Sequence, residues 1–294
     1  MKIGEKIKRL RTAKLMTQSE LVGGEITRNM LSRIENGAAQ PSMATVEYIA
    51  ERLNVSVGFL LADESDEILY FKSAEIGNIK RAYANKDYEL CREMCLNSEW
   101  SDDELDLILA ESTAYVAIEE FSHGNLRRAA ELFDEAIERC KQTIYDTSYI
   151  LSRIKCYFDY MSVISPTLDT NEIYDEDAFL PIVKEKFCLY SYLFLCGEAQ
   201  GYKSIPMLDR AIELLEKSSY GFHIRAKLLI EEGKYQEGYD TLHALLFRDN
   251  GELPEPMLYF VLGDIELCCK EIDDFKGAYD FSKSKINLMQ KLLN

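Results

Sequence analysis

Residues 26–37 read ITRNMLSRIENG, and this stretch decides how the first part of the chain is interpreted. Thr27 is a good helix N-cap and Asn36-Gly37 a good helix stop, so a helix is expected between them. Leu31 and Ile34 are three residues apart and share one face of that helix. The opposite face would carry Arg28, Asn29, Ser32 and Arg33. A face meant only for water more often carries Glu and Lys.

These polar side chains suit a nucleic acid. Arg and Asn make bidentate hydrogen bonds to guanine and adenine edges in the major groove. Thr27 and the free amides at the helix start can meet phosphate. A preceding helix, beginning after Thr17 and ending at Gly23-Gly24, stops only a few residues earlier, which is the spacing of a helix-turn-helix.

The first 62 residues predict a compact domain of five short helices. Thr17 and Glu20 form a capping box at the start of the second helix. Pro41-Ser42 opens the fourth helix and Ser56 opens the fifth. The inward-facing apolar positions are Ile3, Ile7, Leu10, Leu21, Val22, Val46, Ile49, Ala50, Leu53, Phe59 and Leu60.

Residues 3–62 resemble the lambda-repressor-like (XRE-type) helix-turn-helix domain. The resemblance rests on LRTAKLMTQSEL (10–21), TRNMLSRIENG (27–37) and PSMATVEYIAERLNVS (41–56). It implies that the third helix lies in the major groove of double-stranded DNA. The stretch VGGEI between Leu21 and Thr27 is one residue shorter than the usual turn, which affects the angle of the third helix.

The resemblance also implies roles for individual residues. Base readers would be Arg28, Asn29, Ser32 and Arg33. Gln18 would fasten the DNA backbone and brace the third helix. Thr17, Thr27 and Asn36 would contact phosphate or hold the turn, and Arg11 and Glu35 would form a structural ion pair. The alternative is that the five-helix module no longer binds DNA and serves for protein contact.

The net charge of −17 is unevenly distributed. Residues 1–62 hold nine Lys/Arg and six Asp/Glu, or +3, whereas residues 63–294 hold 25 Lys/Arg and 45 Asp/Glu, or −20. A weakly basic head can meet phosphates, while phosphates repel an acidic body. The acidic surface can also serve only for solubility. We expect three parts: the DNA-binding head 1–62, a polar DESDE linker 63–67 and a body 68–294.

Composition narrows the class of protein. The chain has no signal-peptide pattern and no apolar run long enough to span a bilayer, so we expect a soluble cytoplasmic protein without membrane contact. Its eight cysteines include no C-x-x-C pair, which favours buried thiols in a reducing compartment over a redox or zinc role. We see no nucleophile–base pair, phosphate loop or metal set, and therefore expect no enzyme, cofactor or metal.

The body contains a weak internal repeat and no sheet pattern. Ala117 and HGNLRRAAELF (123–133) have the same arrangement as Ala226 and EGKYQEGYDTL (232–242). Each has a Gly at a helix end, an apolar residue two positions later and a small residue three after that. Weaker copies are NKDYELC (85–91), GYKSIPMLDRAIELL (201–215) and EIDDFKGAY (271–279). The segment from Pro166 to Pro181 reads as a loop or insertion.

This pattern resembles the tetratricopeptide repeat, although its Trp-led and Pro-ended parts are missing. The resemblance implies an all-α solenoid of five or six helix pairs whose concave wall binds an extended peptide. Candidate peptide contacts are Tyr115, Asn125, Arg153, Tyr157, Tyr160 and Tyr192. Tyrosines at helical spacing also occur in cores, and that alternative stays open for each of them.

The order of head and body resembles the Rgg-like peptide-responsive transcriptional regulators. This resemblance implies a cytoplasmic homodimer, used in quorum sensing, that binds DNA and a short re-imported peptide. The C-terminal helices, about residues 254–293, are the expected dimer surface. The alternative is that the body binds a partner protein instead of a peptide.

Overall fold

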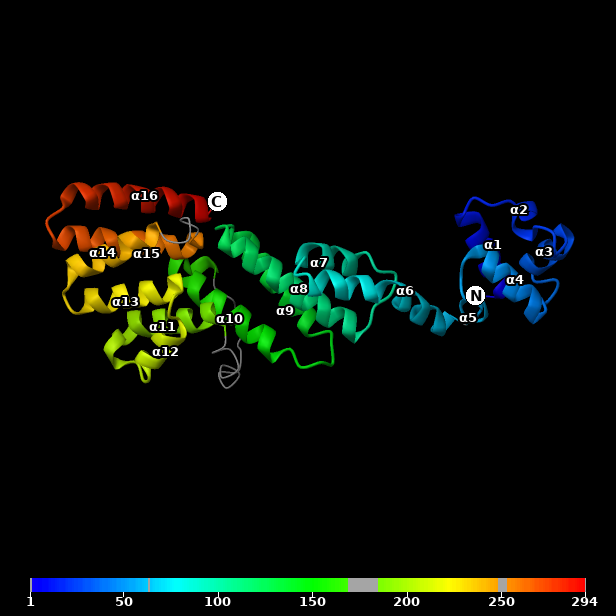
Figure 1. The fold of residues 1–294 in the computed structure, drawn as a ribbon, viewed down its shortest axis with the longest axis horizontal. Coiled ribbons are helices and arrows are strands. Elements are labelled where there is room, and N and C mark those ends of the chain that lie inside the picture. The colour runs from blue at the N-terminus through cyan, green and yellow to red at the C-terminus, as the bar shows by residue number, and fades with distance from the viewer. Residues whose placement is uncertain (1, 63, 169–184, 248–252, 294) are drawn as a thin grey trace. The chain divides into compact units, whose positions relative to one another are not determined.

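The computed structural model describes residues 2–62, 64–168, 185–247 and 253–293 (Figure 1). Helices and no strand occur in these ranges, which confirms the expected all-α class. The helices are α1 Ile3–Ala13, α2 Gln18–Val22, α3 Arg28–Glu35, α4 Met43–Leu53, α5 Val57–Leu61, α6 Glu64–Ala84, α7 Tyr88–Leu96, α8 Asp103–Ser122, α9 Leu126–Cys140, α10 Ser148–Ile164, α11 Lys186–Gln200, α12 Leu208–Leu214, α13 Ser219–Glu231, α14 Tyr235–Leu246, α15 Glu255–Glu271 and α16 Phe275–Leu293.

The chain divides into two compact units, of which the first holds residues 1–81 and 97–100 and the second residues 82–96 and 101–294. Residues 64–67 of the expected linker form the first turn of α6, and residue 63 lies outside the described part.

In the first unit, α1 to α5 surround one small apolar core. Its buried side chains include Ile7, Leu21, Leu31, Ile49 and Leu60. Four hydroxyls cap helices as the sequence predicts: each accepts a hydrogen bond from a backbone N–H in the first turn of its helix, and they belong to Thr17 (α2), Thr27 (α3), Ser42 (α4) and Ser56 (α5). The local sequence therefore sets where each helix begins.

Two side-chain features fix how α1 packs. Gly4 is buried where α1 crosses α3, and a Cβ at Gly4 would lie 2.0 Å from the carbonyl oxygen of Ile34. Lys6 is fully buried, and its ammonium donates to the carbonyl oxygens of Phe59 (3.2 Å) and Ala62 at the end of α5. The lysine satisfies carbonyls that the helix itself leaves without partners.

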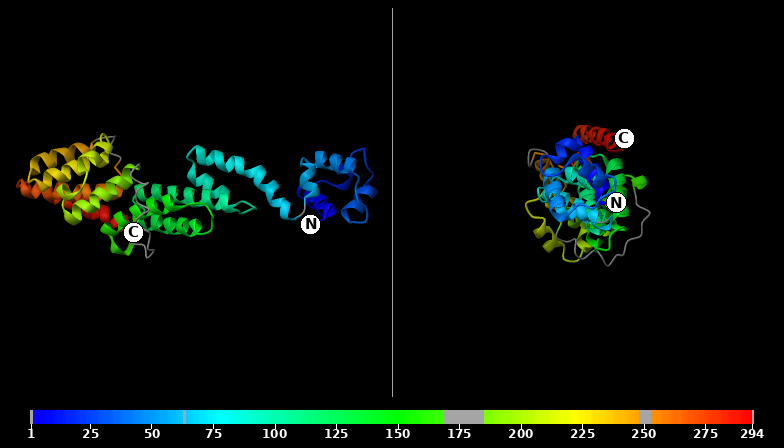
Figure 2. Two further views of the ribbon diagram at one scale, coloured as in Figure 1. Left: turned by 90° about the horizontal axis from the view of Figure 1, so that it is seen from below. Right: turned by 90° about the vertical axis from the view of Figure 1, so that its right-hand side faces the viewer.

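In the second unit, consecutive helices pack side by side as antiparallel hairpins (Figure 1, Figure 2). The repeat read from the sequence is present: Gly124 (φ 81°) turns the chain between α8 and α9, and Gly233 (φ 73°) does so between α13 and α14. The small residues of the pattern are buried where the paired helices cross; a Cβ on Gly238 would lie 3.1 Å from Cγ1 of Ile230.

The weaker repeat copies differ in how closely they follow the pattern. At 271–279, Asp273 takes the left-handed conformation (φ 62°) and Ala278 is buried where α16 packs on α15. At 201–215 the structure has a 3₁₀ turn, Tyr202–Ser204, and then the seven-residue α12 in place of a regular hairpin. Of the expected loop from Pro166, only the 3₁₀ turn Pro166–Leu168 is described, and the remainder lies outside the described residues.

A chain of buried polar groups crosses the core of the second unit. The hydroxyls of Tyr160 (α10) and Tyr190 (α11) are 3.0 Å apart. The Tyr190 hydroxyl is 2.8 Å from Nδ1 of His223 (α13), whose Nε2 is 2.8 Å from Oδ2 of Asp264 (α15). Lys227 donates to Oδ1 of Asp264 at 3.0 Å. Because each group is satisfied by a neighbour, the chain fixes the register of these helices.

No helix in the described ranges is long and apolar enough to cross a bilayer. All eight cysteines are free thiols, and seven are buried while Cys196 is partly exposed.

Candidate nucleic-acid interface and peptide site

Helix α3 presents a polar face to solvent. Leu31 and Ile34 are buried on its inner side. The candidate base readers are on the outer side, where Arg28, Asn29 and Arg33 are exposed and Ser32 is partly exposed. Three candidate phosphate contacts, Thr17, Thr27 and Asn36, are exposed at helix ends, and Gln18 is partly exposed at the start of α2.

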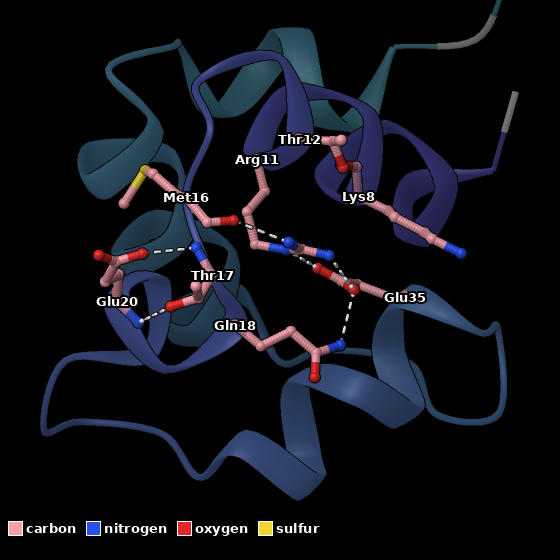
Figure 3. A network of polar contacts seen from close by, with 8 residues as sticks. All are labelled: Lys8, Arg11, Thr12, Met16, Thr17, Gln18, Glu20 and Glu35. Carbon is pink, nitrogen blue, oxygen red and sulfur yellow. Dashed lines mark hydrogen bonds and ion pairs between the residues drawn. The ribbon is translucent and has the colours of Figure 1, made fainter.

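Arg11, Gln18 and Glu35 meet at one point and join α1, α2 and α3 (Figure 3). Nε of Arg11 donates to Oε1 of Glu35 at 2.7 Å, and Nη2 donates to Oε2 at 3.0 Å. Gln18 donates to the same Oε2 at 2.8 Å. The remaining Arg11 nitrogen, Nη1, donates to the Met16 carbonyl at 2.8 Å. Helix α3 is thus braced from both preceding helices.

This brace keeps Glu35 ionised although its side chain is 2 % exposed. Burial alone would raise the pKa of the Glu35 carboxyl. The hydrogen bonds from Arg11 and Gln18, together with the charges of Arg11 and Lys8, outweigh burial and hold the pKa below its ordinary value. The charge of the acidic residue at the end of α3 is therefore compensated within the domain.

The short turn after α2 is closed by helix α4. Gly23 has a φ of 54°, and a Cβ there would lie 2.3 Å from the Tyr48 hydroxyl. That hydroxyl donates to the Val22 carbonyl at 2.9 Å. Arg52, one turn further along α4, donates to the carbonyl oxygens of Leu21 and Glu20. The end of α2 is therefore fixed in spite of the shortened turn.

In the second unit, two of the six candidate peptide contacts come together. The Arg153 guanidinium lies over the Tyr115 ring at 4.8 Å and near the Tyr149 ring at 5.9 Å. Tyr115 stacks on Tyr88 at a centroid distance of 4.1 Å. Tyr149 donates to Glu111 at 3.0 Å. These five residues are named the tyrosine–arginine cluster, and they come from α7, α8 and α10.

Arg153 carries a charge in a buried place. Burial alone would lower its pKa, but the hydrogen bonds and charge of Glu185 outweigh burial and raise it. Nη2 of Arg153 is 2.6 Å from Oε1 of Glu185, and Nε donates to the same carboxylate. Nη1 is buried and has no hydrogen-bond partner among the described residues. The cluster therefore contains an unsatisfied donor.

The other four candidates are elsewhere. Tyr157 and Tyr160 are 5 % and 0 % exposed and pack in the core, so neither presents a surface to a ligand. Their burial follows from the aromatic packing of α10 on α11, where Tyr157 stacks on Phe187 at 4.1 Å. Asn125 is exposed at the start of α9 and donates to Glu120. Tyr192 is 40 % exposed on α11 beside Cys196.

Sequence reasoning did not identify several residues of these sites. Tyr48 and Arg52 are four apart on α4, a spacing that predicts one shared face but not what the face touches. Tyr88 and Glu111 join the cluster through packing between α7, α8 and α10. Glu185 follows a segment outside the described residues, and no sequence pattern connects it with Arg153.

Comparison with known proteins finds a family model that matches part of the first unit. Residues 7–60 match the model of the helix-turn-helix family HTH_3. Similar solved structures include a single-residue mutant of PrgX, at 14 % identity over 98 % of this chain and 99 % of that chain with a TM-score of 0.32. PlcR of Bacillus thuringiensis, in complex with the peptide PapR7 and DNA, is 15 % identical over 99 % and 96 % of the chains with a TM-score of 0.24.

The apo form of the competence regulator ComR from Streptococcus vestibularis is 19 % identical, over 89 % of this chain and 97 % of that chain, with a TM-score of 0.27. No curated protein sequence matches the chain.

Proposed function

We propose that this chain, whose residues 7–60 form a helix-turn-helix domain, is a cytoplasmic, non-enzymatic transcriptional regulator that binds double-stranded DNA through residues 1–62. The observation that carries the proposal is the outer face of α3. Arg28, Asn29 and Arg33 are exposed there, while the one acidic residue of the helix, Glu35, is turned inward and paired. A surface with three exposed hydrogen-bonding or cationic groups and no exposed carboxylate suits base edges and phosphates.

Within this proposal each part of the face has a role. Arg28 and Asn29, in the first turn of α3, read bases. Thr17 and Thr27 lie at helix N-termini, whose free amides favour phosphate. The amide nitrogen of Gln18 donates one hydrogen bond to Glu35. Its second N–H would contact the DNA backbone.

The experiment compares Arg28→Ala with Gln18→Ala on an operator selected by the wild-type chain from random DNA. Loss of a base-reading Arg should weaken binding by about 1–3 kcal/mol and relax the preference at one base pair. Gln18→Ala should weaken binding to all sequences about equally, because it acts on backbone and brace. Measurements are made at fixed salt. If Arg28→Ala loses the same binding affinity for every DNA sequence, Arg28 contacts a phosphate and does not read a base.

We further propose that residues 68–294, joined to the head by the linker 63–67, bind a short peptide at the tyrosine–arginine cluster. Tyrosine supplies large, rigid contact area, and the buried Arg153 guanidinium, 4.8 Å from the Tyr115 ring, holds that ring in place. The net charge of residues 63–294, −20, favours a cationic or free-amine peptide. The second candidate, a partner protein, would use the same surface.

The peptide proposal is tested by mass spectrometry. Peptides released by denaturing the purified chain are identified, and a library of short synthetic peptides is passed over the wild type, Tyr115→Ala and Tyr145→Ala. Tyr145 is the matched control, because it is 48 % exposed on the turn before α10 and belongs to no cluster contact. Tyr115→Ala should lose the retained peptides and Tyr145→Ala should keep them. If the wild-type chain retains no peptide, the result favours a partner protein as the ligand.

The proposed regulator is a homodimer, and α16 offers the surface. Four large apolar side chains of α16 are exposed: Phe275 (68 %), Tyr279 (67 %), Ile286 (55 %) and Met289 (37 %). They follow one another at spacings of four, seven and three residues. Such spacing places them in one stripe along the helix. Ile286→Glu should give a monomer in sedimentation at micromolar concentration. Asn287→Glu, on the same helix but beside the stripe, should stay dimeric; a wild-type monomer would contradict the assignment.

A further inference from the structure

A second polar surface of the head lies on α1 and is not part of the recognition face. An open groove of about 810 Å³ runs between α1 and the end of α3. Its lining includes Lys2, Lys8, Arg9, Thr12, Asn36 and Gly37, all of which are exposed. Glu5 and Glu35 also line it.

The acidic members of the groove are already engaged. Glu35 is held by Arg11 and Gln18, and a Glu5 carboxylate oxygen accepts from the Lys2 backbone N–H at 3.2 Å in the N-terminal turn of α1. The Lys8 side chain is exposed, and its positive charge acts on the Glu35 carboxylate. Apart from these two carboxylates, the charged side chains that line the groove are the cations Lys2, Lys8 and Arg9.

The cations share one side of α1. Lys8 and Thr12 are four residues apart and Arg9 and Thr12 three apart, so they lie on one helical face. Lys8 stands beside Glu35 (Figure 3). Asn36, which we assign to phosphate, belongs both to the end of the recognition helix and to this groove. The groove is thus continuous with the proposed DNA surface.

We propose that this α1 groove holds a stretch of DNA backbone flanking the bases read by α3, with Lys8 and Arg9 neutralising phosphates. This inference rests on the proposed DNA-binding function and extends the contact surface to a third helix. A row of two cations beside an open groove fits the closely spaced phosphates of a strand, about 3.4 Å of helix axis per charge. The contacts set affinity and position but carry no sequence information.

A structural role for the same cations would give different results. Basic groups near the end of α3 also stabilise that helix through its dipole. Loss of such a role would lower stability but would leave the salt dependence of DNA binding unchanged. The slope of log K against log salt, in contrast, counts the counterions that phosphate contacts release.

The experiment uses the full chain and the operator selected by the wild type, with fluorescence anisotropy over salt concentrations of roughly 50–200 mM. The variants are Lys8→Gln, Arg9→Gln, the double variant and Lys8→Arg, with Lys14→Gln as control. Lys14 is exposed at the end of α1 and outside the groove. Thermal unfolding verifies that each variant folds. A second arm replaces DNA with inorganic phosphate at matched ionic strength, to detect a site for a free anion.

Lys8→Gln and Arg9→Gln should each reduce the steepness of the log K against log salt slope by about 0.9, and the double variant should reduce it by about twice that. Each variant should weaken binding to specific and to random DNA alike. Lys8→Arg should keep the wild-type slope. Wild-type slopes in both Gln variants, or an equal loss in Lys14→Gln, would overturn the groove assignment. Saturable phosphate binding without an effect on DNA would also overturn it. Absence of any DNA binding by the wild type would instead contradict the proposed function itself.

Discussion

Replacing Arg11 by alanine removes the group that joins α1 to both α3 and the turn before α2. Glu35 keeps Gln18 as its single hydrogen-bond donor, and the Met16 carbonyl loses its side-chain donor. Removing one partner of a buried pair costs about 3–5 kcal/mol because the remaining charge is buried without compensation. Since Arg11 is 14 % exposed and water can enter at its side, we expect the lower end, about 3 kcal/mol.

The substitution should also reverse the pH dependence of the head's stability. In the wild type the pKa of Glu35 is lowered, so its contribution is present above the unfolded pKa, about 4.3, and is lost as pH falls through the folded value. Without Arg11, burial is opposed only by Gln18 and Lys8, and we expect the pKa of Glu35 to rise. The variant should then gain stability as pH falls from about 7 toward 4.

A urea titration of the full chain, read by a short deuterium pulse and mass spectrometry of fragments from residues 3–60, measures the head by itself. Lys14→Ala is the matched control on the same helix, and it should leave the urea midpoint unchanged. An Arg11→Ala midpoint equal to the wild type would refute the reasoning, because the pair would then be worth no more than an exposed one, about 0–1 kcal/mol.

Further predictions concern packing and buried charge. Gly4→Ala should destabilise the head by about 1–3 kcal/mol or more and weaken DNA binding, because its Cβ would meet the Ile34 carbonyl, whereas Gly24→Ala, which meets nothing within 4 Å, should be nearly neutral in the same urea titration. Burial alone would raise the pKa of Asp264, but its hydrogen bond to His223 and the nearby positive charges hold it below the ordinary value. Asp264 therefore stabilises the second unit above about pH 4, and this contribution is lost as pH falls. Asp264→Asn should lower the unit's melting temperature at pH 7 and flatten its fall below pH 5, as followed by circular dichroism.

The sequence alone determined the helices of the head and the repeat of the body. Capping hydroxyls such as Thr17 and Thr27 and stops such as Gly233 act within one or two turns of chain, so a local pattern is enough to predict them. The inward faces followed from helical periodicity for the same reason. That Arg28 and Asn29 are exposed together could be predicted, since Leu31 and Ile34 fix which side of α3 is buried.

The tertiary structure alone decided what long polar side chains touch. Lys6 is not among the apolar positions that helical spacing turns inward, yet it is buried beneath α5, because the free carbonyls at the end of that helix offer it better partners than its own sequence neighbours do. Tyr160 and Tyr115 look alike in the sequence, but one is in the core and the other in a partly exposed cluster. Which tyrosine is buried depends on how helices far apart in the chain pack, and helical spacing carries no information about that choice.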